Sequence, residues 1–471
     1  MTEHILFLTG KLAEKRLHRV LESIAAEDFT YEIRNIGVNV ASLMTAGMIS
    51  RRLQTVGDAD RVIVPGLCRG DLGQLTEKFA VPFVRGTDDL KDLPKYFGRK
   101  FEETDLSRHA VRIFAEIVDA AEITTEELVQ RAMGFRAAGA DVIDIGCLPD
   151  THFPGLEESV TTLKSEGFKV SVDSMDAEEL LRGGRAGADY LLSLKESTLW
   201  ITDEVDSIPI LIPEHHPEID SLYRAMDTLT RAGKPFIADS ILDPIHFGFT
   251  TSLIRYSELR DRYPEVEIMM GIGNLTELTE ADTSGVNAIL FGVISELQIG
   301  NILATQVSPH ASSAIREADA ARRMFFAARE QQSLPKGIDA SLLTCHERDP
   351  FPYDADEINE LASEIRDPSY RIQVSEAGIH VYNRDGIQLS DDPYELFPQL
   401  QELNDDSAHA FYMGMELAKA QIALQLGKRY RQDEDLNWGA AFVNVGEEQT
   451  DSNSYRKPGT TLKKSPPAEK E

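Results

Sequence analysis

The chain has 471 residues, and 79 acidic against 48 basic side chains give it a formal net charge of −31. Hydrophobic residues make up 42% and charged residues 27% of the chain, which excludes collagen-like, mucin-like and wholly disordered proteins. The negative charge argues against general binding to nucleic acid or to anionic membranes, because both need a basic surface. At roughly 150 residues per domain, this length suggests about three domains.

The cysteines and the N-terminal residues indicate the compartment. Cys68, Cys147 and Cys345 are too few and too widely spaced for a disulfide framework, which suits a reducing environment. The run His4–Gly10 lacks the basic start and the long apolar segment of a signal peptide. No apolar stretch approaches the roughly 18 residues of a membrane-spanning helix. We therefore expect a cytoplasmic protein without a membrane partner.

Residues 1–105 alternate apolar runs with helical patterns, as is typical of a parallel sheet with helices on its faces. This predicts a Rossmann-like α/β domain. Glycine-rich turns follow its strands, where open α/β sheets bind ligands, but tight turns without a ligand explain them equally well, because no GxGxxG or P-loop pattern is present. The predicted strands are Ile5–Leu8, Tyr31–Asn35, Arg61–Pro65 and Val81–Arg85, with helices at Lys11–Ala26 and Ala41–Thr55.

Residues 108–330 repeat a strand-then-helix pattern eight times. Eight such units in about 220 residues predict a central (β/α)8 TIM barrel, whose chemistry lies at the carboxyl ends of the strands. The predicted strands are Val111–Val118, Asp141–Ile145, Phe168–Val172, Tyr190–Leu194, Ile208–Ile212, Pro235–Ala238, Glu267–Met270 and Ala288–Phe291. The predicted helices include Thr125–Ala138, Ala177–Ala186, Ile219–Ala232 and Ser252–Arg262.

Residues 336–445 follow a different pattern, which predicts a small C-terminal α+β domain. Two short strands lie within Arg371–Asn383, and a long helix follows at about Ala408–Tyr430. An apolar stripe on this helix is typical of packing in a core or in a dimer interface. The stripe consists of Phe411, Met415, Ala418 and Ile422. Residues 446–471 have lost apolar side chains, and we expect a disordered tail there.

Acidic and polar side chains follow the predicted barrel strands. Clustered carboxylates raise one another's pKa unless a positive group is near, so such a mouth suits a metal ion, a sugar or a ligand with several N–H donors. A pterin has a 2-amino-pyrimidinone edge whose N–H groups one carboxylate can accept. Asp173 could instead cap the following helix, whereas Asp144 lies inside an apolar strand and needs a partner. In chain order, the strand-end residues are Glu116, Asp119, Asp144, Asp173, Ser193, Lys195, His215, His216, Asp239, Asp243 and Asn274.

Two motifs resemble the pterin-binding barrel family, which contains the dihydropteroate synthases and the pterin-dependent methyltransferases. They are Ala137–Cys147 with the following Phe153–Gly155, and Val170–Ser174. The resemblance covers about residues 110–330. It implies that the barrel is of the pterin-binding type.

The resemblance assigns catalytic roles to three aspartates. Asp144 would line the pterin pocket, and Asp173 would face the same cavity. For the family's pterin-binding aspartate on the sixth strand there are two candidates: Asp239 fits the strand end better, whereas Asp243 keeps the Asp-Pro dipeptide. We favour Asp239 as the catalytic residue and place Asp243 among the substrate-binding residues.

Other positions depart from the synthase pattern. Glu116 and Asp119 replace the synthases' first-loop motif, and Asn274 falls where synthases have Ser-Arg-Lys; both features resemble the methyltransferase branch. Ser193 replaces a synthase Asn, and His310 parallels an anion-binding Arg-x-His. The expected substrate-binding residues are Glu116, Asp119, Ser193, Lys195, Asp243, Asn274 and His310. Glu116 or Asp119 would hold Mg²⁺. The basic candidates for phosphate are Lys195, His215, His216 and His310.

An N-terminal α/β domain, a pterin barrel and a C-terminal extension resemble the plan of a divergent synthase-like group in organisms that use tetrahydromethanopterin. This implies a transferase that joins 6-hydroxymethyl-7,8-dihydropterin diphosphate to a phosphorylated arylamine, a ribofuranosylaminobenzene phosphate, in tetrahydromethanopterin biosynthesis. The alternatives are a pterin-dependent methyltransferase and a non-catalytic pterin-binding protein. The expected partners are these two small molecules and a second copy of the chain in a homodimer.

Overall fold

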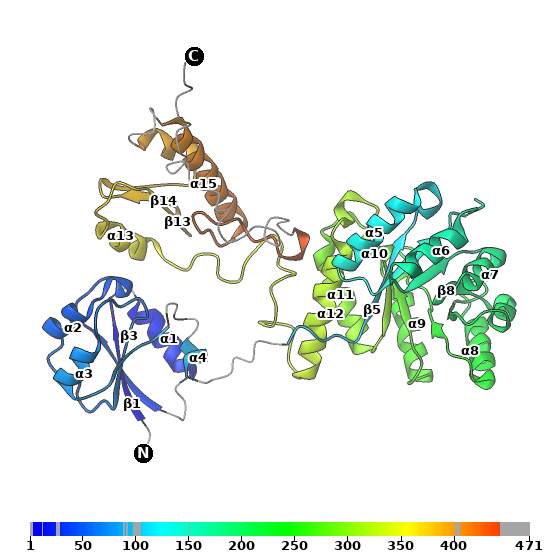
Figure 1. Ribbon diagram of the computed structural model, residues 1–471, viewed down its shortest axis with the longest axis horizontal. Coiled ribbons are helices and arrows are strands. Elements are labelled where there is room, and N and C mark those ends of the chain that lie inside the picture. The colour runs from blue at the N-terminus through cyan, green and yellow to red at the C-terminus, as the bar shows by residue number, and fades with distance from the viewer. Residues whose placement is uncertain are drawn as a thin grey trace, which may run out of the picture. The chain divides into compact units, whose positions relative to one another are not determined.

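The computed structural model describes most of residues 3–442 in two compact units. The barrel unit comprises Asp105–Thr344 and Trp438–Gln449. The flanking unit comprises the residues up to Thr104 together with Cys345–Asn437. Figure 1 labels the elements of both units. The tail predicted at 446–471 lies outside the described residues. Within 3–442, the residues not described are 12, 25–28, 88–89, 91–92, 98–104, 150 and 401–405.

Eight parallel strands form the centre of the barrel unit. They are β5 (Arg112–Ile117), β6 (Val142–Gly146), β7 (Val170–Asp173), β8 (Tyr190–Leu194), β9 (Ile208–Leu211), β10 (Ile237–Ala238), β11 (Met269–Gly271) and β12 (Asn301–Thr305). Their order in the sheet is β10-β9-β8-β7-β6-β5-β12-β11. A parallel bridge between Ala238 and Ile268 joins the two ends of the sheet, so the sheet is a nearly closed barrel. This confirms the predicted α/β fold class.

Helices surround the barrel (Figure 1), and two of them, α5 and α7, begin at residues whose side chains cap the helix. Thr124 and Glu127 form a capping box at the start of α5 (Thr125–Ala137). The side chain of Asp176 accepts a hydrogen bond at the start of α7 (Ala177–Arg185). The other helices are α6 (Leu156–Ser165), α8 (Asp220–Ala232), α9 (Phe249–Arg262), α10 (Gly273–Thr276), α11 (Thr283–Glu296) and α12 (Ala314–Glu330), with a 3-10 segment, η4 (Glu196–Asp203), between β8 and β9.

The prediction of the eighth strand at Ala288–Phe291 is wrong. These residues lie inside α11, where Leu290, Phe291 and Ile294 are buried at helical spacing. The eighth strand is β12, which pairs with both β5 and β11. A short apolar run does not distinguish a buried strand from a buried helix turn by its periodicity, which explains the error.

The barrel interior is filled by apolar side chains below the carboxyl ends of the strands. Phe114 and Tyr190 form an edge-to-face pair with ring centroids 4.9 Å apart. The other buried members of this interior cluster are Val142, Leu192, Ile210, Ile237 and Met269. Alternate strand residues point to the same face. Glu116 and Asp144, which lie two residues after Phe114 and Val142, therefore also point into the barrel, nearer to the carboxyl ends of the strands.

The N-terminal part of the flanking unit is a four-stranded parallel sheet. Its strands are β1 (Glu3–Thr9), β2 (Phe29–Asn35), β3 (Arg61–Val64) and β4 (Phe83–Arg85), in the order β2-β1-β3-β4. The helices are α1 (Glu14–Ile24), α2 (Ala46–Arg52), α3 (Gly73–Phe79) and α4 (Leu93–Tyr96). Leu6 and Leu8 pack on the face covered by α2 and α3, whereas Ile5 and Phe7 pack on the face covered by α1. The four predicted strands are confirmed.

The C-terminal part of the flanking unit is an antiparallel sheet with helices. It contains α13 (Ala355–Ser363), β13 (Arg371–Ser375), β14 (Gly378–Asn383), β15 (Gly386–Ser390), α14 (Pro393–Leu396) and α15 (Ser407–Leu426). The two predicted strands are confirmed, and β15 adds a third. The long helix ends at Leu426 rather than at Tyr430, because Gly427 takes a left-handed conformation with φ of 61°.

The predicted apolar stripe of α15 is not in the core of the unit. Phe411 is 72% exposed and Met415 49% exposed. The buried face carries Met413, Leu417 and Ala420 instead. The helix is apolar almost all round, so the pattern did not distinguish its two faces.

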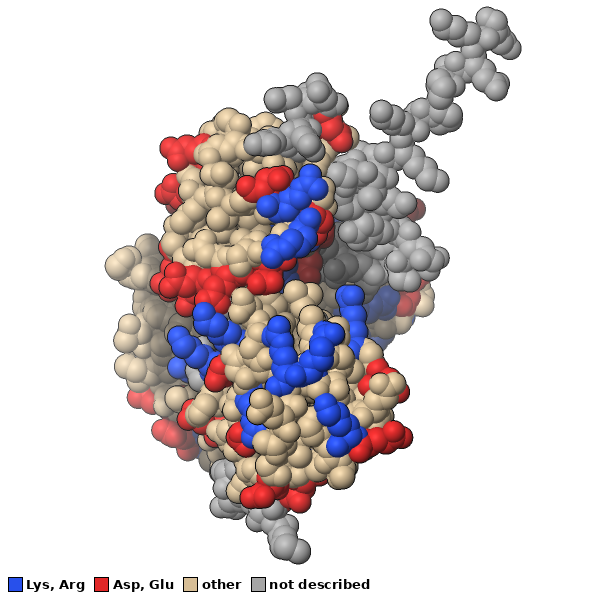
Figure 2. Space-filling view, turned by 90° about the vertical axis from the view of Figure 1, so that its left-hand side faces the viewer, with Lys and Arg blue, Asp and Glu red and all other residues tan. Residues whose placement is uncertain are grey.

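Charge is unevenly distributed on the flanking unit. Figure 2 shows Lys and Arg gathered over the lower, N-terminal part of the visible face, and Asp and Glu over the upper part. Arg51 and Arg52 at the end of α2 and Lys78 of α3 are among the exposed basic residues. The overall negative charge therefore does not describe every surface. Among the residues that the structure describes, none of the helices has the length and apolarity that a bilayer crossing requires.

Candidate functional site

Three acidic side chains from adjacent strands meet at the carboxyl end of the barrel. Glu116 of β5, Asp144 of β6 and Asp173 of β7 each place a carboxylate oxygen within 4.8 Å of the other two. The strand register causes this, since Glu116 pairs with Asp144 and Gly146 with Asp173. We call these three residues the acid cluster. The sequence predicted each of them as a site residue, and the structure brings them together.

Gly146 makes room for the acid cluster. A Cβ at this position would lie 2.7 Å from Glu116 Oε1 and 2.9 Å from the Cα of Val118. Both distances are shorter than van der Waals contact, so any larger residue would displace the Glu116 carboxylate or the β5 backbone. The glycine in the Asp-Ile-Gly part of the family-like motif therefore has a steric function.

Among the described residues, no basic side chain forms a hydrogen bond or an ion pair with the acid cluster. Burial raises the pKa of Glu116 to about 7. Burial, with the negative charges of Glu116 and Asp239, raises the pKa of Asp173 to about 8. Burial and the charges of Asp173 and Glu116 hold the pKa of Asp144 well above its usual range. Near neutral pH the cluster therefore retains protons, or takes a cation or N–H donors in their place.

Asp144 is the most deeply buried member of the cluster, with an exposed fraction of 0%. Ser171 Oγ donates a hydrogen bond to Asp144 Oδ1, while Asp144 Oδ2 has no partner among the described residues. A buried oxygen without a partner is costly unless a proton or a ligand satisfies it. Sequence reasoning missed Ser171. The signal that could have found it is its position two residues before Asp173, on the same inward face.

Asp173 does not cap a helix. The cap of α7 is Asp176, whose side chain accepts a hydrogen bond from the Glu178 N–H at 2.8 Å. Asp173 lies instead at the end of β7 and belongs to the acid cluster. The capping alternative is therefore not the arrangement in the structure.

The two sixth-strand candidates have different surroundings. Asp239 Oδ1 accepts hydrogen bonds from Tyr256 Oη at 2.6 Å and from the Ile241 N–H at 2.7 Å. Burial nevertheless raises the pKa of Asp239 to about 6, and its charge acts on Asp173. Sequence reasoning missed Tyr256, because nothing in the pattern of α9 marks the side chain that turns toward Asp239.

Asp243 is part of a buried ion pair instead. Its Oδ2 accepts a hydrogen bond from Arg255 Nη2 at 2.8 Å, and its Oδ1 lies 2.6 Å from His216 Nε2. Arg255 also donates to the Ser240 and Ile241 carbonyl oxygens. These contacts occupy both carboxylate oxygens of Asp243, so its role here is to hold the loop after β10.

Three other predicted residues are engaged outside the acid cluster. Asp119 accepts a hydrogen bond from Arg131 of α5 at 2.6 Å. Asn274 is exposed, and its Nδ2 donates to the Leu242 carbonyl oxygen at 2.7 Å. His310 is exposed, with Nε2 3.2 Å from the Thr276 carbonyl oxygen.

The fourth and fifth strands end in less specific surroundings. Ser193 and Lys195 are half-buried at the end of β8, and His215 is exposed. Hydrogen bonds from Ser197, together with the charge of Lys195, lower the pKa of Glu214. Lys195 is thus the predicted phosphate ligand that is partly sheltered from solvent, and its charge acts on Glu214.

The loop that carries Phe153–Gly155 is held by α7. The Phe153 N–H donates to Glu179 Oε1 at 3.2 Å, and Arg182 Nη2 donates to the Phe153 carbonyl oxygen at 3.0 Å. Glu179 Oε2 accepts a further hydrogen bond from Ser174 Oγ at 2.7 Å. The two family-like motifs are therefore joined through Glu179, which sequence reasoning did not single out.

Comparison with known proteins adds one family match and one relative. A model of a family of unknown function, DUF6513, matches residues 3–88. The uncharacterized protein MJ0107 of Methanocaldococcus jannaschii is 26% identical over 522 aligned positions, which cover 92% of this chain and 98% of the relative. The similarity to this relative thus extends over both units.

The solved structures that resemble this chain include dihydropteroate synthases. The Yersinia pestis enzyme with a pterine–sulfa conjugate is 18% identical, with a TM-score of 0.37, and the match covers 48% of this chain and 95% of that one. The Xanthomonas albilineans enzyme in complex with 7,8-dihydropteroate is 16% identical, with a TM-score of 0.36, covering 49% and 96%. The barrel architecture is established by the strand order and strand pairing of this chain itself.

Proposed function

We propose that the barrel binds a reduced pterin at the acid cluster and joins it to an arylamine, as a dihydropteroate synthase-like transferase. The observation that carries the proposal is the buried Asp144 Oδ2, which lacks a partner among the described residues and belongs to three carboxyls without a basic neighbour. The N–H donors of a 2-amino-pyrimidinone edge would satisfy this oxygen. The family-like motif around Asp144 supports the same assignment.

In the proposed reaction, the arylamine nitrogen attacks the methylene carbon of 6-hydroxymethyl-7,8-dihydropterin diphosphate. A C–N bond forms while the C–O bond to diphosphate breaks, the bonding electrons leave with the diphosphate, and the amine loses one proton. Asp144 would hold the pterin edge. Asp239 would orient the ring through Oδ2, which no described residue occupies, since Tyr256 and Ile241 both bind Oδ1.

The acceptor that we propose is a ribofuranosylaminobenzene phosphate, in tetrahydromethanopterin biosynthesis. Its phosphate and the diphosphate leaving group both require positive charge in a strongly negative protein. Arg255 is already paired with Asp243, so Lys195 is the side chain that we propose for phosphate binding.

A Mg²⁺ ion is a further part of the proposal. With Asp144 engaged by the pterin edge, the carboxylate oxygens of Glu116 and Asp173, which lie within 4.8 Å of each other, are the hard donors left for Mg²⁺. Glu116 belongs to this donor set, whereas Asp119 is bonded to Arg131. Of the two predicted ligands, Glu116 therefore fits. Bound Mg²⁺ would offset the negative charge of the carboxylates and of a diphosphate.

The test is incubation of the full chain with the dihydropterin diphosphate and either ribofuranosylaminobenzene phosphate or p-aminobenzoate, with product detection by mass spectrometry. We expect a condensation product with the phosphorylated arylamine, and loss of product in Asp144→Asn. The matched control is Asp206→Asn, which changes an exposed aspartate before β9.

Product from p-aminobenzoate alone would overturn the proposed acceptor. Pterin binding without any product would overturn the synthase reaction, and methyl transfer from a methylated reduced pterin would then identify a methyltransferase. No pterin binding by folded protein would overturn the whole proposal.

A further inference from the structure

The sheet of the flanking unit has a topological switch point between β1 and β3. The chain leaves β1 for β2 on one side and returns to β3 on the other. The helix that follows β1 packs on one face, and the helices α2 and α3 pack on the opposite face. In open α/β sheets, ligands bind in the crevice that this divergence leaves at the carboxyl ends of the strands.

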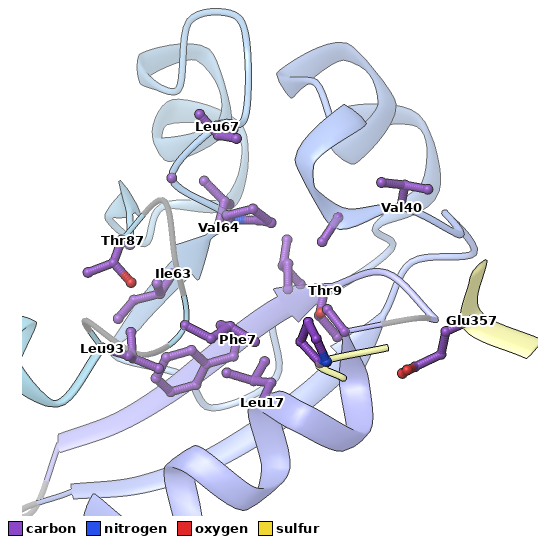
Figure 3. A pocket seen from close by; sticks show the side chains of 18 of the residues that line it. Phe7, Thr9, Leu17, Val40, Ile63, Val64, Leu67, Thr87, Leu93 and Glu357 are labelled. Carbon is purple, nitrogen blue, oxygen red and sulfur yellow. The ribbon is translucent and has the colours of Figure 1, made fainter. Parts of the chain in front are cut away.

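A cavity of about 400 Å³ lies at this switch point. Its base is apolar: Phe7 of β1, Ile63 of β3 and Leu17 of α1 lie close together around it in Figure 3. The strand ends contribute Thr9 and, after β4, Thr87. This volume is at the lower end of ligand pockets, which span roughly 300–1,000 Å³, so it suits a single-ring compound rather than a dinucleotide.

The C-terminal part of the same unit completes the cavity. Tyr353, Glu357 and Arg429 belong to its wall. Two contacts hold α13 against the turns of the sheet: Lys11 Nζ binds Glu360 Oε1 at 2.8 Å, and Asn39 Nδ2 donates to Glu364 Oε1 at 3.1 Å. The cavity is thus built by segments about 350 residues apart in the chain, as the 349-residue separation of Lys11 and Glu360 shows.

One basic side chain in the wall of the cavity, Arg429, is placed to bind an anionic group of a ligand. Arg429 is half-buried and forms neither a hydrogen bond nor an ion pair with another residue in the described ranges. A sheltered guanidinium without an anionic partner favours a carboxylate or phosphate ligand. Glu357 competes only weakly with such a ligand for Arg429, because its Oε2 already accepts a hydrogen bond from the Asp354 N–H in the capping box of α13.

The first helix does not offer the usual phosphate site of such folds. Glu14 occupies the first turn of α1, and its Oε2 accepts a hydrogen bond from Asn35 Nδ2 at 3.1 Å. A carboxylate at this helix start repels an anion there. The anion is therefore directed to Arg429, on the side of the cavity that the C-terminal part supplies.

We propose that this cavity binds a single-ring aromatic carboxylate or phosphate monoester, with the ring on Phe7, Ile63 and Leu17 and the anionic group on Arg429. The site lies wholly in the flanking unit and shares no residue with the acid cluster. It is therefore independent of the function proposed for the barrel.

The test has a binding arm and a mapping arm, both on the full chain. Calorimetry with benzoate, phenyl phosphate and inorganic phosphate compares the wild type with Arg429→Gln and Arg429→Lys. The matched control is Arg431→Gln, which alters an exposed arginine on the same segment that does not line the cavity. Photolabelling with 4-azidobenzoate, followed by peptide mapping, locates the bound ring.

We expect one aromatic anion per chain and a label within residues 7–17, 63–67 or 352–361. Arg429→Gln should weaken binding at least about tenfold, Arg429→Lys less, and Arg431→Gln not at all. Stronger binding of benzoate or of phenyl phosphate would identify the anionic group. Equal binding of inorganic phosphate, a label confined to barrel peptides, or no saturable binding by folded protein would each overturn the proposal.

Discussion

Glu116 and Asp144 face each other in register on β5 and β6, with carboxylate oxygens within 4.8 Å. Two buried acids at this distance cannot both ionise at low cost. Asp173 brings a third carboxyl to the same place. This arrangement makes the carboxyl end of the barrel sensitive to protons, cations and hydrogen-bond donors.

The stability of the protein should depend on pH through Glu116. Its folded-state pKa of about 7 is above that of an unfolded carboxyl, so this contribution to stability is complete below about pH 4 and is lost as the pH rises through about 7. Glu116→Gln removes this pH-dependent loss of stability, because glutamine does not ionise. We expect the free energy of unfolding of this variant, relative to the wild type, to increase by about 2 kcal/mol between pH 5 and pH 8. Urea denaturation measures it, and the exposed Glu166→Gln should show no such trend.

Asp144→Asn should separate a ligand-binding role from a structural one. Asparagine keeps the shape and the acceptor for Ser171 but removes the group whose ionisation is penalised. We expect unchanged or higher stability near pH 8, and pterin binding weakened at least about tenfold. Thermal unfolding and calorimetry with 7,8-dihydropterin measure the two effects. A variant that loses stability but keeps pterin affinity would contradict this role.

The two sixth-strand aspartates should respond differently to amidation. Asp243→Asn leaves the buried Arg255 without its anionic partner and should destabilise the fold by about 3 kcal/mol. Asp239→Asn keeps an acceptor for Tyr256 and should lower pterin affinity with a smaller change in stability. Denaturation and calorimetry on both variants decide between the candidates, and the reverse pattern would favour Asp243.

Gly146→Ala tests the steric requirement beside the cluster. The added methyl group would lie 2.7 Å from Glu116 Oε1 and 2.9 Å from the Val118 Cα, which should cost about 1–3 kcal/mol of stability. The control is Gly134→Ala in α5, where an added Cβ meets nothing within 4 Å. This substitution should stabilise the helix by about 0.5–1 kcal/mol. Equal melting temperatures for the two variants would show that the site tolerates a side chain.

Mg²⁺ should stabilise the wild type more at pH 8 than at pH 5.5, because protons and the cation compete for the same oxygens. Thermal unfolding with increasing Mg²⁺ measures this through mass action. Glu116→Gln should reduce the effect, whereas Asp119→Asn should leave it intact because Asp119 is bonded to Arg131. An Mg²⁺ effect that is equal in all three proteins would show that the ion binds elsewhere.

Much of the fold was predictable because local patterns report local structure. The strand and helix alternation identified seven of the barrel strands and the four strands of the N-terminal sheet. The eighth strand was misplaced, since Ala288–Phe291 is equally apolar as a helix turn. The apolar stripe of α15 is not in the core, because the helix is apolar almost all round, and its alternative role in a dimer interface stays a prediction. The three-domain division at 105, 336 and 446 stays a prediction, and the structure describes the N-terminal and C-terminal parts within one unit.

The sequence by itself determined that carboxyl groups follow the barrel strands and that Asp144 is buried inside one. Only the tertiary structure decided that Glu116, Asp144 and Asp173 converge, because convergence depends on strand register and barrel closure. It likewise decided that Arg255 and His216 bind the two oxygens of Asp243, whereas the described partners of Asp239 both bind its Oδ1. Spacing along a chain fixes which face a side chain takes, but contacts between distant strands arise only when the sheet closes.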